Sequence, residues 1–484
     1  MTYYVLVSQT IYFKGCIRMV FSSTVFLFLF LPLALAGYYN PLWKGRAFRN
    51  SFLLLASLGF YAWGEPVFVF IMALSIAVNW ALVLAMARHR EQGQRKRWLV
   101  AAIGFDVALL VVFKYVSFIA RNMGLVLGKD SVALTIALPI GISFFTFQIM
   151  SYVFDVYYRK AAAQRSLVNL ALYISMFPQL IAGPIVRYQT VAAEIERRAE
   201  NAGDFALGMT RFAIGLGKKL LIANYAGFIA DRLFGLDSLS VASAWLGAVA
   251  YSLQIFFDFS GYSDMAIGLG RLFGFHFLEN FDYPYTAVSI TGFWRRWHIS
   301  LSTWFRDYVY IPLGGSRVTK PRLLLNLLAV WGLTGVWHGA NWTFVVWGLA
   351  YFALIALERF TGFAGRLPRA VARAYTLLCV LVLWVLFRAE SLPLAGRYIA
   401  ALFGFGATGF IDETFWLYAG NGKWVLLAGL LLSTPVARGC GAALARRDVR
   451  VYRIASALGV IALFSVSLLV CIKATYNPFI YFNF

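Results

Sequence analysis

The chain has 484 residues, of which 61% are apolar and 13% charged, and 43 Lys and Arg against 21 Asp and Glu give a formal charge of +22. Soluble domains carry about 45 to 50% apolar and about 25% charged residues, so the composition excludes a disordered chain, a fibrous repeat and a typical soluble enzyme. The basic residues fall in short gaps between apolar runs, which indicates loop anchors at a lipid surface and no nucleic-acid partner. We therefore expect an all-α polytopic membrane protein.

The first 18 residues differ from the rest of the chain. They precede a second methionine, Met19, and the sequence MVFSSTVFLFLFLP that begins there looks like a natural start. We expect Met1 to Arg18 to be an upstream extension without a role in the fold, and residues 19–484 to form a single membrane domain.

Apolar runs long enough to cross about 30 Å of hydrocarbon recur along the chain. The first, near residues 20–39, has no small-residue cleavage site followed by a soluble domain, so we interpret it as a retained span and not a signal peptide. Because some runs are short enough to be re-entrant, we expect about 10 to 13 transmembrane or re-entrant helices. The other runs lie near 51–63, 66–87, 98–118, 133–158, 167–186, 211–234, 241–273, 323–357, 374–387, 423–436 and 451–472.

Clusters of basic residues predict the topology. The short segment RHREQGQRKR, residues 88–97, should stay in the cytoplasm because Lys and Arg mark cytoplasmic loops. The basic clusters at 366–373 and 438–453 should lie on the same side.

The longest uncharged run, Leu323 to Leu357, would extend about 52 Å as one helix, so it must tilt, break or cross twice. The natural break is GVWHGANW, where Gly335 and Gly339 flank His338. An ionisable group at membrane depth is a functional candidate by default, and a buried neutral imidazole suits a general base. The structural alternative is a core histidine whose ring nitrogens pair with Asn341 or a backbone carbonyl.

A second candidate site lies upstream in GFWRRWHISLSTWFRDYVYIPLGGSR, residues 292–317. Trp294, Trp297, Arg295 and Arg296 surround His298 in the sequence. The pattern is typical of an amphipathic helix whose arginines hold lipid phosphates, or of the rim of a site for an anionic acyl donor.

Two carboxylates, Asp258 and Asp264, interrupt the apolar run from 241 to 273. We expect Gly261 to break the helix so that both turn inward, and we favour a structural pairing with Arg295 or Arg271 over direct catalysis.

The remaining histidines and the cysteines suggest no metal site. His89 lies in a basic loop and is expected to be solvated, whereas His276 is expected to pack at the interface. The four cysteines, at 16, 379, 440 and 471, show no metal-ligand spacing. His298 and His338 lack a third ligand of convincing spacing for zinc.

The motifs together resemble a known family. The run GFWRRWHISLSTWFRDYVYIPLGG followed by GVWHGANWTFVVWG, with IFFDFSGYSDMAIG before them, resembles the bacterial branch of the membrane-bound O-acyltransferase family, most of all its alginate-acetylating members. SFFTFQIMSYVFDVYYRK and MFPQLIAGPIVRY fit the same branch, and the core motifs fall within residues 140–360. The resemblance implies a ring of tilted helices around a central tunnel, in which His338 and His298 meet.

The resemblance also implies the chemistry. The family moves an acyl group from a cytoplasmic thioester to a hydroxyl, so we expect acetyl-CoA as donor and no permanently bound cofactor. His338 would accept the hydroxyl proton, and His298 would orient or polarise the reacting groups, with a hydrogen bond to the carbonyl oxygen. Trp294, Trp297, Trp337 and Asn341 would line the cavity, while Arg295 and Arg296 would bind donor phosphates.

The implied setting is a bacterial inner membrane, where a periplasmic serine-type acetyltransferase partner would receive the acetyl group and modify an exopolysaccharide. Three alternatives stay open at the sequence level: D-alanyl transfer to teichoic acid from a carrier protein, O-acetylation of peptidoglycan or cellulose, and a transporter that uses His and Asp as a proton relay.

Overall fold

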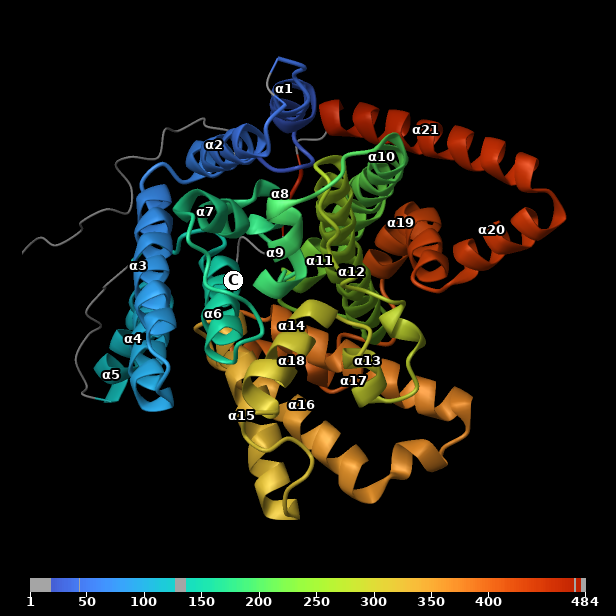
Figure 1. Cartoon of the computed structure of the whole chain (residues 1–484). Coiled ribbons are helices and arrows are strands. Elements are labelled where there is room, and N and C mark those ends of the chain that lie inside the picture. The colour runs from blue at the N-terminus through green and yellow to red at the C-terminus, as the bar shows by residue number, and fades with distance from the viewer. Residues whose placement is uncertain (1–18, 43, 127–135, 474–475, 480–484) are drawn as a thin grey trace, which may run out of the picture. The chain divides into compact units, whose positions relative to one another are not determined.

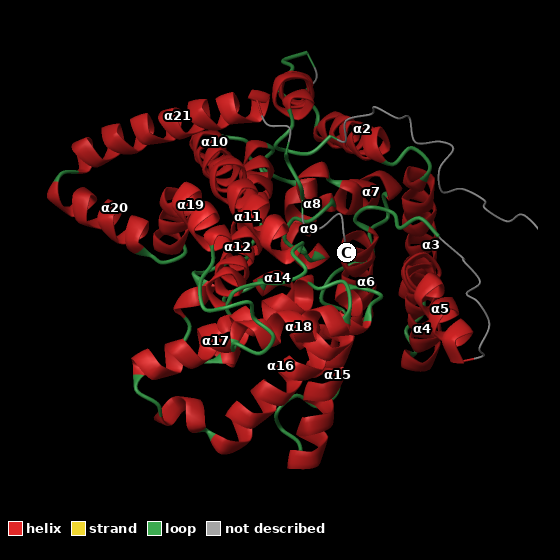
Figure 2. Ribbon diagram, turned by 180° about the vertical axis from the view of Figure 1, so that it is seen from behind, coloured by secondary structure: helices red, strands yellow, loops and turns green. Residues whose placement is uncertain are grey.

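The computed structural model describes residues 19–42, 44–126, 136–473 and 476–479, and this part of the chain contains helices and loops without strands (Figures 1 and 2). The all-α membrane architecture expected from the composition is confirmed. The expected extension, Met1 to Arg18, lies outside the described residues.

The chain forms two compact units. The first comprises Met1–Gly208 and Leu269–Leu278, and the second comprises Met209–Gly268 and Glu279–Phe484. The helices that begin in the first unit are η1 (Phe26–Phe30), α1 (Leu31–Tyr38), α2 (Arg46–Gly64), α3 (Phe68–Arg88), α4 (Gln92–Leu110), η2 (Val111–Tyr115), α5 (Val116–Val126), α6 (Ile142–Tyr157), α7 (Leu167–Ser175), α8 (Phe177–Leu180), α9 (Tyr188–Glu196) and α10 (Ala202–Gly217).

The second unit holds the remaining helices. These are η3 (Lys218–Ala223), α11 (Asn224–Phe234), α12 (Val241–Leu272), η4 (Pro284–Thr286), α13 (Ile290–Trp294), α14 (Ile299–Phe305), η5 (Arg306–Tyr310), α15 (Lys320–His338), α16 (Trp342–Thr361), η6 (Phe363–Arg366), α17 (Arg369–Arg388), α18 (Leu392–Leu402), α19 (Glu413–Leu432), α20 (Val436–Arg447) and α21 (Val449–Lys473). The last residues of α12 belong to the first unit.

Eight helical segments of the described chain are long and apolar enough to cross a membrane. Two shorter apolar helices accompany them, so the total matches the lower end of the expected range. The eight are Phe68–Arg88, Gln92–Leu125, Ala202–Phe234, Val241–Leu272, Trp342–Thr361, Arg369–Arg388, Glu413–Leu432 and Val449–Lys473, and the shorter two are Phe26–Tyr38 and Leu392–Leu402. The run near 20–39, expected to span, is therefore shorter as a helix than a crossing needs.

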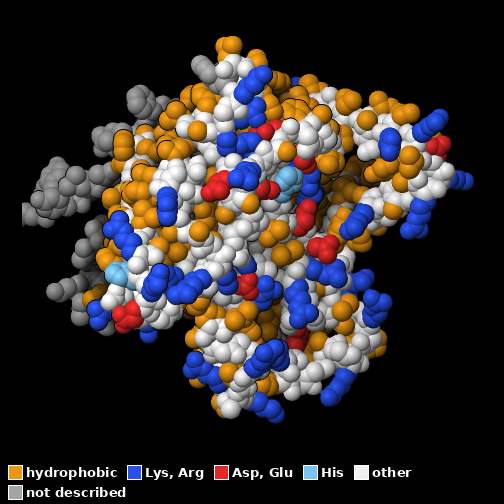
Figure 3. Space-filling view, in the orientation of Figure 1, with side chains coloured by type: hydrophobic (Ala, Val, Ile, Leu, Met, Phe, Trp, Pro, Cys, Tyr) orange, Lys and Arg blue, Asp and Glu red, His pale blue; other side chains and the backbone are white. Residues whose placement is uncertain are grey.

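Large apolar side chains remain exposed on several of these helices, as a lipid solvent allows. Phe70 of α3 is 74% exposed and Leu458 of α21 is 62% exposed. Figure 3 shows broad hydrophobic areas between separate groups of Lys and Arg. Both features agree with a multi-pass membrane protein that exposes apolar side chains to lipid.

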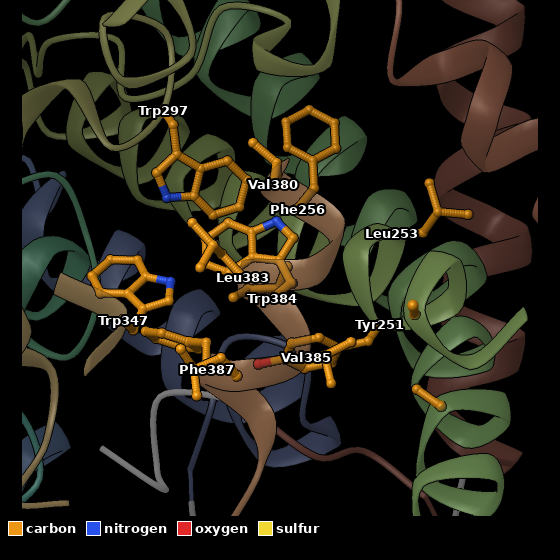
Figure 4. Packing of buried hydrophobic residues seen from close by; sticks show 14 of the residues in the cluster. Tyr251, Leu253, Phe256, Trp297, Trp347, Val380, Leu383, Trp384, Val385 and Phe387 are labelled. Carbon is orange, nitrogen blue, oxygen red and sulfur yellow. The ribbon is translucent and has the colours of Figure 1, made fainter. Parts of the chain in front are cut away.

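The core of the second unit is aromatic. Trp294, Trp297, Trp347 and Trp384 are all buried within one hydrophobic cluster, part of which Figure 4 shows. Edge-to-face ring pairs dominate this cluster, which is the packing that aromatic quadrupoles favour. Both candidate histidines pack against rings of this cluster, His338 against Trp347 and His298 against Phe259.

Candidate active site

The break in the longest apolar run places His338 at the end of a helix. α15 ends at His338 and α16 begins at Trp342, so the run forms two packed helices, and the predicted break is confirmed. The turn between them begins at Gly339, whose backbone is extended. Gly335, expected to share in the break, instead lies inside α15.

Three aromatic rings enclose the His338 imidazole. The ring centroids of Trp337 and Trp347 lie 5.0 Å from it, and that of Phe387 lies 5.1 Å from it. His338 is 5% exposed and Trp347 is fully buried. The imidazole is therefore buried in apolar surroundings, as the sequence predicted, whereas its depth in a membrane stays a prediction.

His298 occupies a second buried position, at the N-cap of α14. Its backbone is left-handed, with φ 44° and ψ 54°, which is uncommon outside glycine. Its ring packs edge-on against Phe259 at 4.6 Å and lies 6.2 Å from Trp337. Trp337 thus contacts both histidines, and the structure brings the two predicted residues into one aromatic cluster.

The electrostatics of His298 favour a neutral ring. His298 lies outside the eight candidate spans and is 1% exposed. Burial lowers the pKa of its imidazole well below the ordinary value because the charged form loses its hydration. His298 is therefore neutral near pH 7 and has one ring nitrogen able to accept a proton.

Asn280 is a partner of His298 that the sequence interpretation missed. Its Oδ1 lies 3.2 Å from His298 Nδ1, 3.1 Å from Ser300 N and 2.9 Å from Ser300 Oγ. Its Nδ2 donates to Ser263 Oγ over 3.1 Å. No local pattern signals this contact, because Asn280 precedes His298 by a loop and two short helices.

The predicted tunnel-lining residues divide into two groups. Trp294 contacts Trp347 at 5.6 Å, and Trp347 in turn contacts His338. Trp297 packs into the same core against Trp384 at 4.9 Å. Trp337 contacts both histidines directly, and the lining of a tunnel by any of these rings stays a prediction.

The other three residues predicted at the site lie differently. Arg295 is exposed, and Arg296 donates from Nη1 to Thr286 Oγ1 over 3.1 Å. Asn341 caps α16 by accepting from Thr343 N over 3.2 Å, and its Nδ2 donates to Glu390 O over 2.8 Å. The pairing of Asn341 with the His338 ring, considered as a structural alternative, is not what the described contacts show.

The two aspartates are paired, but with different partners from those expected. Asp258 pairs with Lys219 at 2.8 Å, and Asp264 pairs with Arg211 at 2.7 Å and Lys218 at 2.6 Å. The predicted partners were wrong because α10 and η3, and not the later arginines, pack along α12.

The predicted break at Gly261 was also wrong, since α12 continues through it. Its missing side chain instead permits a close helix crossing: a Cβ on Gly261 would lie 2.8 Å from Gly215 O. The glycine therefore serves packing between helices.

Glu358 is a second residue that the sequence interpretation missed, since it served only to mark the end of the apolar run. It is 7% exposed, and its carboxylate accepts from Ile290 N over 2.6 Å and from Thr291 N over 3.0 Å. Both amides lie at the N-terminus of α13, where backbone N–H groups lack intrahelical partners. Glu358 is part of α16, so these hydrogen bonds attach the start of α13 to α16. The segment that begins there carries Trp294 and His298.

The remaining histidines are surface residues. His89 is half-buried and stacks on Trp98 at 6.4 Å. His276 is 45% exposed in side chain and lies 2.7 Å from Glu194 and 3.4 Å from Asp204, so the expected packing role is replaced by a polar cluster.

The fold and this site define a class: a multi-pass α-helical membrane protein with two buried histidines joined through a tryptophan in an aromatic core. Comparison with known proteins identifies the family within that class. A family model described as MBOAT, membrane-bound O-acyltransferase family, matches residues 55–389. The chain belongs to the membrane-bound O-acyltransferase family, and it is an acyltransferase.

Several relatives are similar over most of their length. The chain is 46% identical to a probable alginate O-acetylase of Azotobacter vinelandii, over 80% of this chain and 79% of the relative. It is 44% identical to a probable alginate O-acetylase of Pseudomonas putida, over 80% and 81%. It is also 35% identical to a peptidoglycan O-acetyltransferase of Helicobacter pylori, over 80% of each chain.

Proposed function

We propose that this protein moves an acetyl group from acetyl-CoA in the cytoplasm across a bacterial inner membrane, for O-acetylation of an alginate-like exopolysaccharide. The similarity to alginate O-acetylases supports the acyl group and the polymer class. The observation that carries the chemistry is the buried pair His298 and His338, joined through Trp337.

The reaction is an acyl exchange between sulfur and oxygen. The oxygen of an acceptor hydroxyl attacks the thioester carbonyl carbon, the carbon–sulfur bond breaks, and the hydroxyl proton passes through an imidazole to the leaving thiolate. Proton transfer of this kind contributes about 10² to 10⁴-fold to the rate. A neutral imidazole shielded from water suits this task near pH 7.

Binding of the donor and delivery of the acetyl group complete the proposal. The exposed Arg295 and the neighbouring Arg296 would bind donor phosphates, because guanidinium groups match phosphate geometry. A periplasmic serine-type acetyltransferase would receive the acetyl group and modify the polymer. No metal or bound cofactor takes part in this proposal.

His338→Ala tests the proposal. The purified full-length protein, incubated with radiolabelled acetyl-CoA and a hydroxyl acceptor, should release free coenzyme, and the variant should lose at least about 100-fold in rate. Circular dichroism should show an unchanged helix content. His89→Ala is the matched control and should retain the wild-type rate, since His89 lies in the basic turn between α3 and α4.

Two outcomes would contradict the proposal. Wild-type activity in His338→Ala would exclude the buried pair as the reaction centre. Transfer from a D-alanyl carrier protein in place of acetyl-CoA would assign a different donor and a different polymer.

A further inference from the structure

Two basic segments of the first unit meet at one end of its helices. Residues 88–97, which join α3 to α4, and residues 157–160, at the end of α6, together carry seven Lys and Arg and a single carboxylate, Glu91. Figure 3 shows Lys and Arg side chains gathered at the lower end of α3 and α4 as Figure 1 labels them. This basic patch consists of six exposed residues, Arg88, Arg90, Lys96, Arg97, Arg159 and Lys160, around the buried Arg95.

Arg95 ties the two segments together. It is 5% exposed, and its Nη2 donates to Val156 O over 2.7 Å and to Tyr157 O over 3.1 Å. Its Nη1 lies 3.5 Å from Met86 O. The last carbonyls of a helix lack intrahelical partners, so this guanidinium, from the first turn of α4, satisfies the ends of both α3 and α6. The exposed cations are thereby gathered at a common end of three helices.

Arg159 brings a further charge close to the turn between α3 and α4. Its backbone φ is 60°, a left-handed value that is uncommon outside glycine. Its Nη2 lies 3.5 Å from Arg90 O, although the two residues are far apart in the sequence. Positive charges held this close repel one another, and an anion bound between them offsets the repulsion. The patch therefore has the electrostatics of an anion site.

The patch lies where two candidate membrane spans end. Phe68–Arg88 and Gln92–Leu125 are each long and apolar enough to cross a membrane, so the short turn between them belongs at a membrane surface. Aromatic rings accompany the charges. Tyr158 is 42% exposed, with Lys160 Nζ 5.7 Å from its ring centroid, and Trp98 is half-buried. Because Tyr and Trp gather at the headgroup level of a bilayer, these rings indicate the level of the lipid phosphates.

We propose that the basic patch binds the phosphate groups of anionic phospholipids, with Arg90 and Arg159 as its central ligands. Guanidinium groups match phosphate oxygens with paired hydrogen bonds, and clusters of about four to eight Lys and Arg beside a membrane helix attract anionic lipids. A phosphate held by both arginines links the α3–α4 turn to the end of α6, the same elements that Arg95 joins from inside. This interaction goes beyond acetyl transfer and does not depend on which acyl group the protein moves.

The surroundings favour a lipid over a soluble phosphate. Val100, one helical turn after Arg97, is 61% exposed, so exposed charge and exposed apolar surface adjoin on α4. A phospholipid is an amphiphile that meets both, with its phosphate on the cations and its acyl chains on the apolar face. A soluble anion uses only the charge.

The first experiment measures lipid binding to the full-length protein in a neutral detergent by native mass spectrometry. Dioleoylphosphatidylglycerol is the anionic probe, and dioleoylphosphatidylcholine, with the same acyl chains, is the neutral one. The wild type should bind the first phosphatidylglycerol at least about 10-fold more tightly. The difference should shrink as salt is added, because salt screens exposed charges. Equal affinities for the two lipids would overturn the inference.

The second experiment locates the site. The double variant Arg90→Gln with Arg159→Gln should weaken phosphatidylglycerol binding about 30-fold, since each basic residue near an anionic lipid contributes about 5-fold. Arg446→Gln with Arg447→Gln is the matched control, because it removes the same charge from an exposed helix end on α20. It should change the affinity for the first lipid by less than about 2-fold. Equal losses in the two double variants would show general attraction to net charge and no defined site.

The single variant Arg90→Gln guards against a double variant that does not fold. Arg90 is exposed, and its contact with Arg159 uses its backbone oxygen, so the substitution leaves that contact in place. It should weaken phosphatidylglycerol binding about 5-fold. Wild-type affinity in this variant would contradict the assignment of Arg90 as a ligand.

Competition separates a lipid from other anions. Inorganic phosphate and coenzyme A, each at millimolar concentration, should leave phosphatidylglycerol bound to the wild type. Displacement by either one would assign the patch to a soluble phosphate, and displacement by an acidic carrier protein would assign it to a protein partner. Either result would overturn the lipid assignment.

Discussion

At the scale of single residues, charges inside the second unit are stabilised by close partners. The Asp258 and Lys219 side chains are 1% and 4% exposed and lie 2.8 Å apart. Lys219 Nζ also donates to the backbone oxygen of Pro478. An unpaired charge in such surroundings costs several kcal/mol, so each member of the pair makes burial of the other tolerable.

Lys219→Met should therefore be strongly destabilising. It leaves the Asp258 carboxylate buried without its cation, and the free energy of unfolding should fall by about 3 to 5 kcal/mol. Thermal unfolding of the purified protein in detergent, followed by circular dichroism, measures the change.

Two further variants complete this test. The double variant Lys219→Met with Asp258→Asn removes both charges and should recover most of the lost stability. Arg306→Met disrupts the exposed pair with Asp307 and should change stability by less than about 1 kcal/mol. Equal instability of the single and double variants would show that the buried charge is not the cause.

At the scale of elements, two glycines determine how closely α15 and α16 approach. A Cβ on Gly348 would lie 2.5 Å from Trp331 O and 2.9 Å from the Cα of Gly335. These are backbone atoms, which cannot rotate away. Small residues at helix crossings allow such contact within membranes, and here the crossing positions His338 relative to Trp347.

Gly348→Ala should force the two helices apart. Overpacking of this kind costs about 1 to 3 kcal/mol, and a displacement of about 1 Å at the site costs about 100-fold in rate. The thermal midpoint and the rate of acetyl transfer are measured on the same preparation.

Gly332→Ala is the matched control on α15, because a Cβ there meets no atom within 4 Å. It should retain activity and gain up to about 1 kcal/mol, since alanine favours the helix interior. Retained activity in Gly348→Ala would show that the close crossing is not needed.

At the scale of the whole molecule, the first unit is held together by a charge cluster that joins distant parts of the chain. The Glu200 carboxylate lies 2.6 Å from Arg46 and 2.8 Å from Arg49 and accepts from Tyr38 OH over 2.5 Å. Burial alone would raise the pKa of Glu200, but hydrogen bonds from Arg46 and Tyr38 and the charges of Arg46 and Arg49 outweigh it and lower the pKa to about 2.

The depressed pKa predicts the direction of the acid response. An unfolded glutamate has a pKa near 4.5, so the stabilisation is present above that pH and is lost as the pH falls toward 2. Glu200→Gln should lack this pH-dependent contribution to the free energy of unfolding, which amounts to about 3 kcal/mol at neutral pH.

Unfolding of the wild type and Glu200→Gln is compared between pH 6 and pH 2.5, and the two should converge as the pH falls. Glu413→Gln, at the exposed start of α19, should follow the wild-type curve. A constant difference between Glu200→Gln and the wild type would contradict the linkage.

The sequence by itself determined the membrane class, most of the long helices and the candidate histidines. Hydropathy is a local property, so an apolar run, a basic loop or a Gly-flanked break can be identified from the sequence without knowing which helices pack against it. This is why the break at Gly339 and the burial of His338 were predicted correctly, and why the family could be recognised from its motifs.

Only the tertiary structure decided which polar groups meet. Asp258 pairs with Lys219, Glu358 accepts from the first amides of α13, and Asn280 Oδ1 lies 3.2 Å from His298 Nδ1. Each pair joins residues of separate elements. Which residues meet depends on how the helices cross and on which of their faces pack together, and the composition of the chain does not determine this.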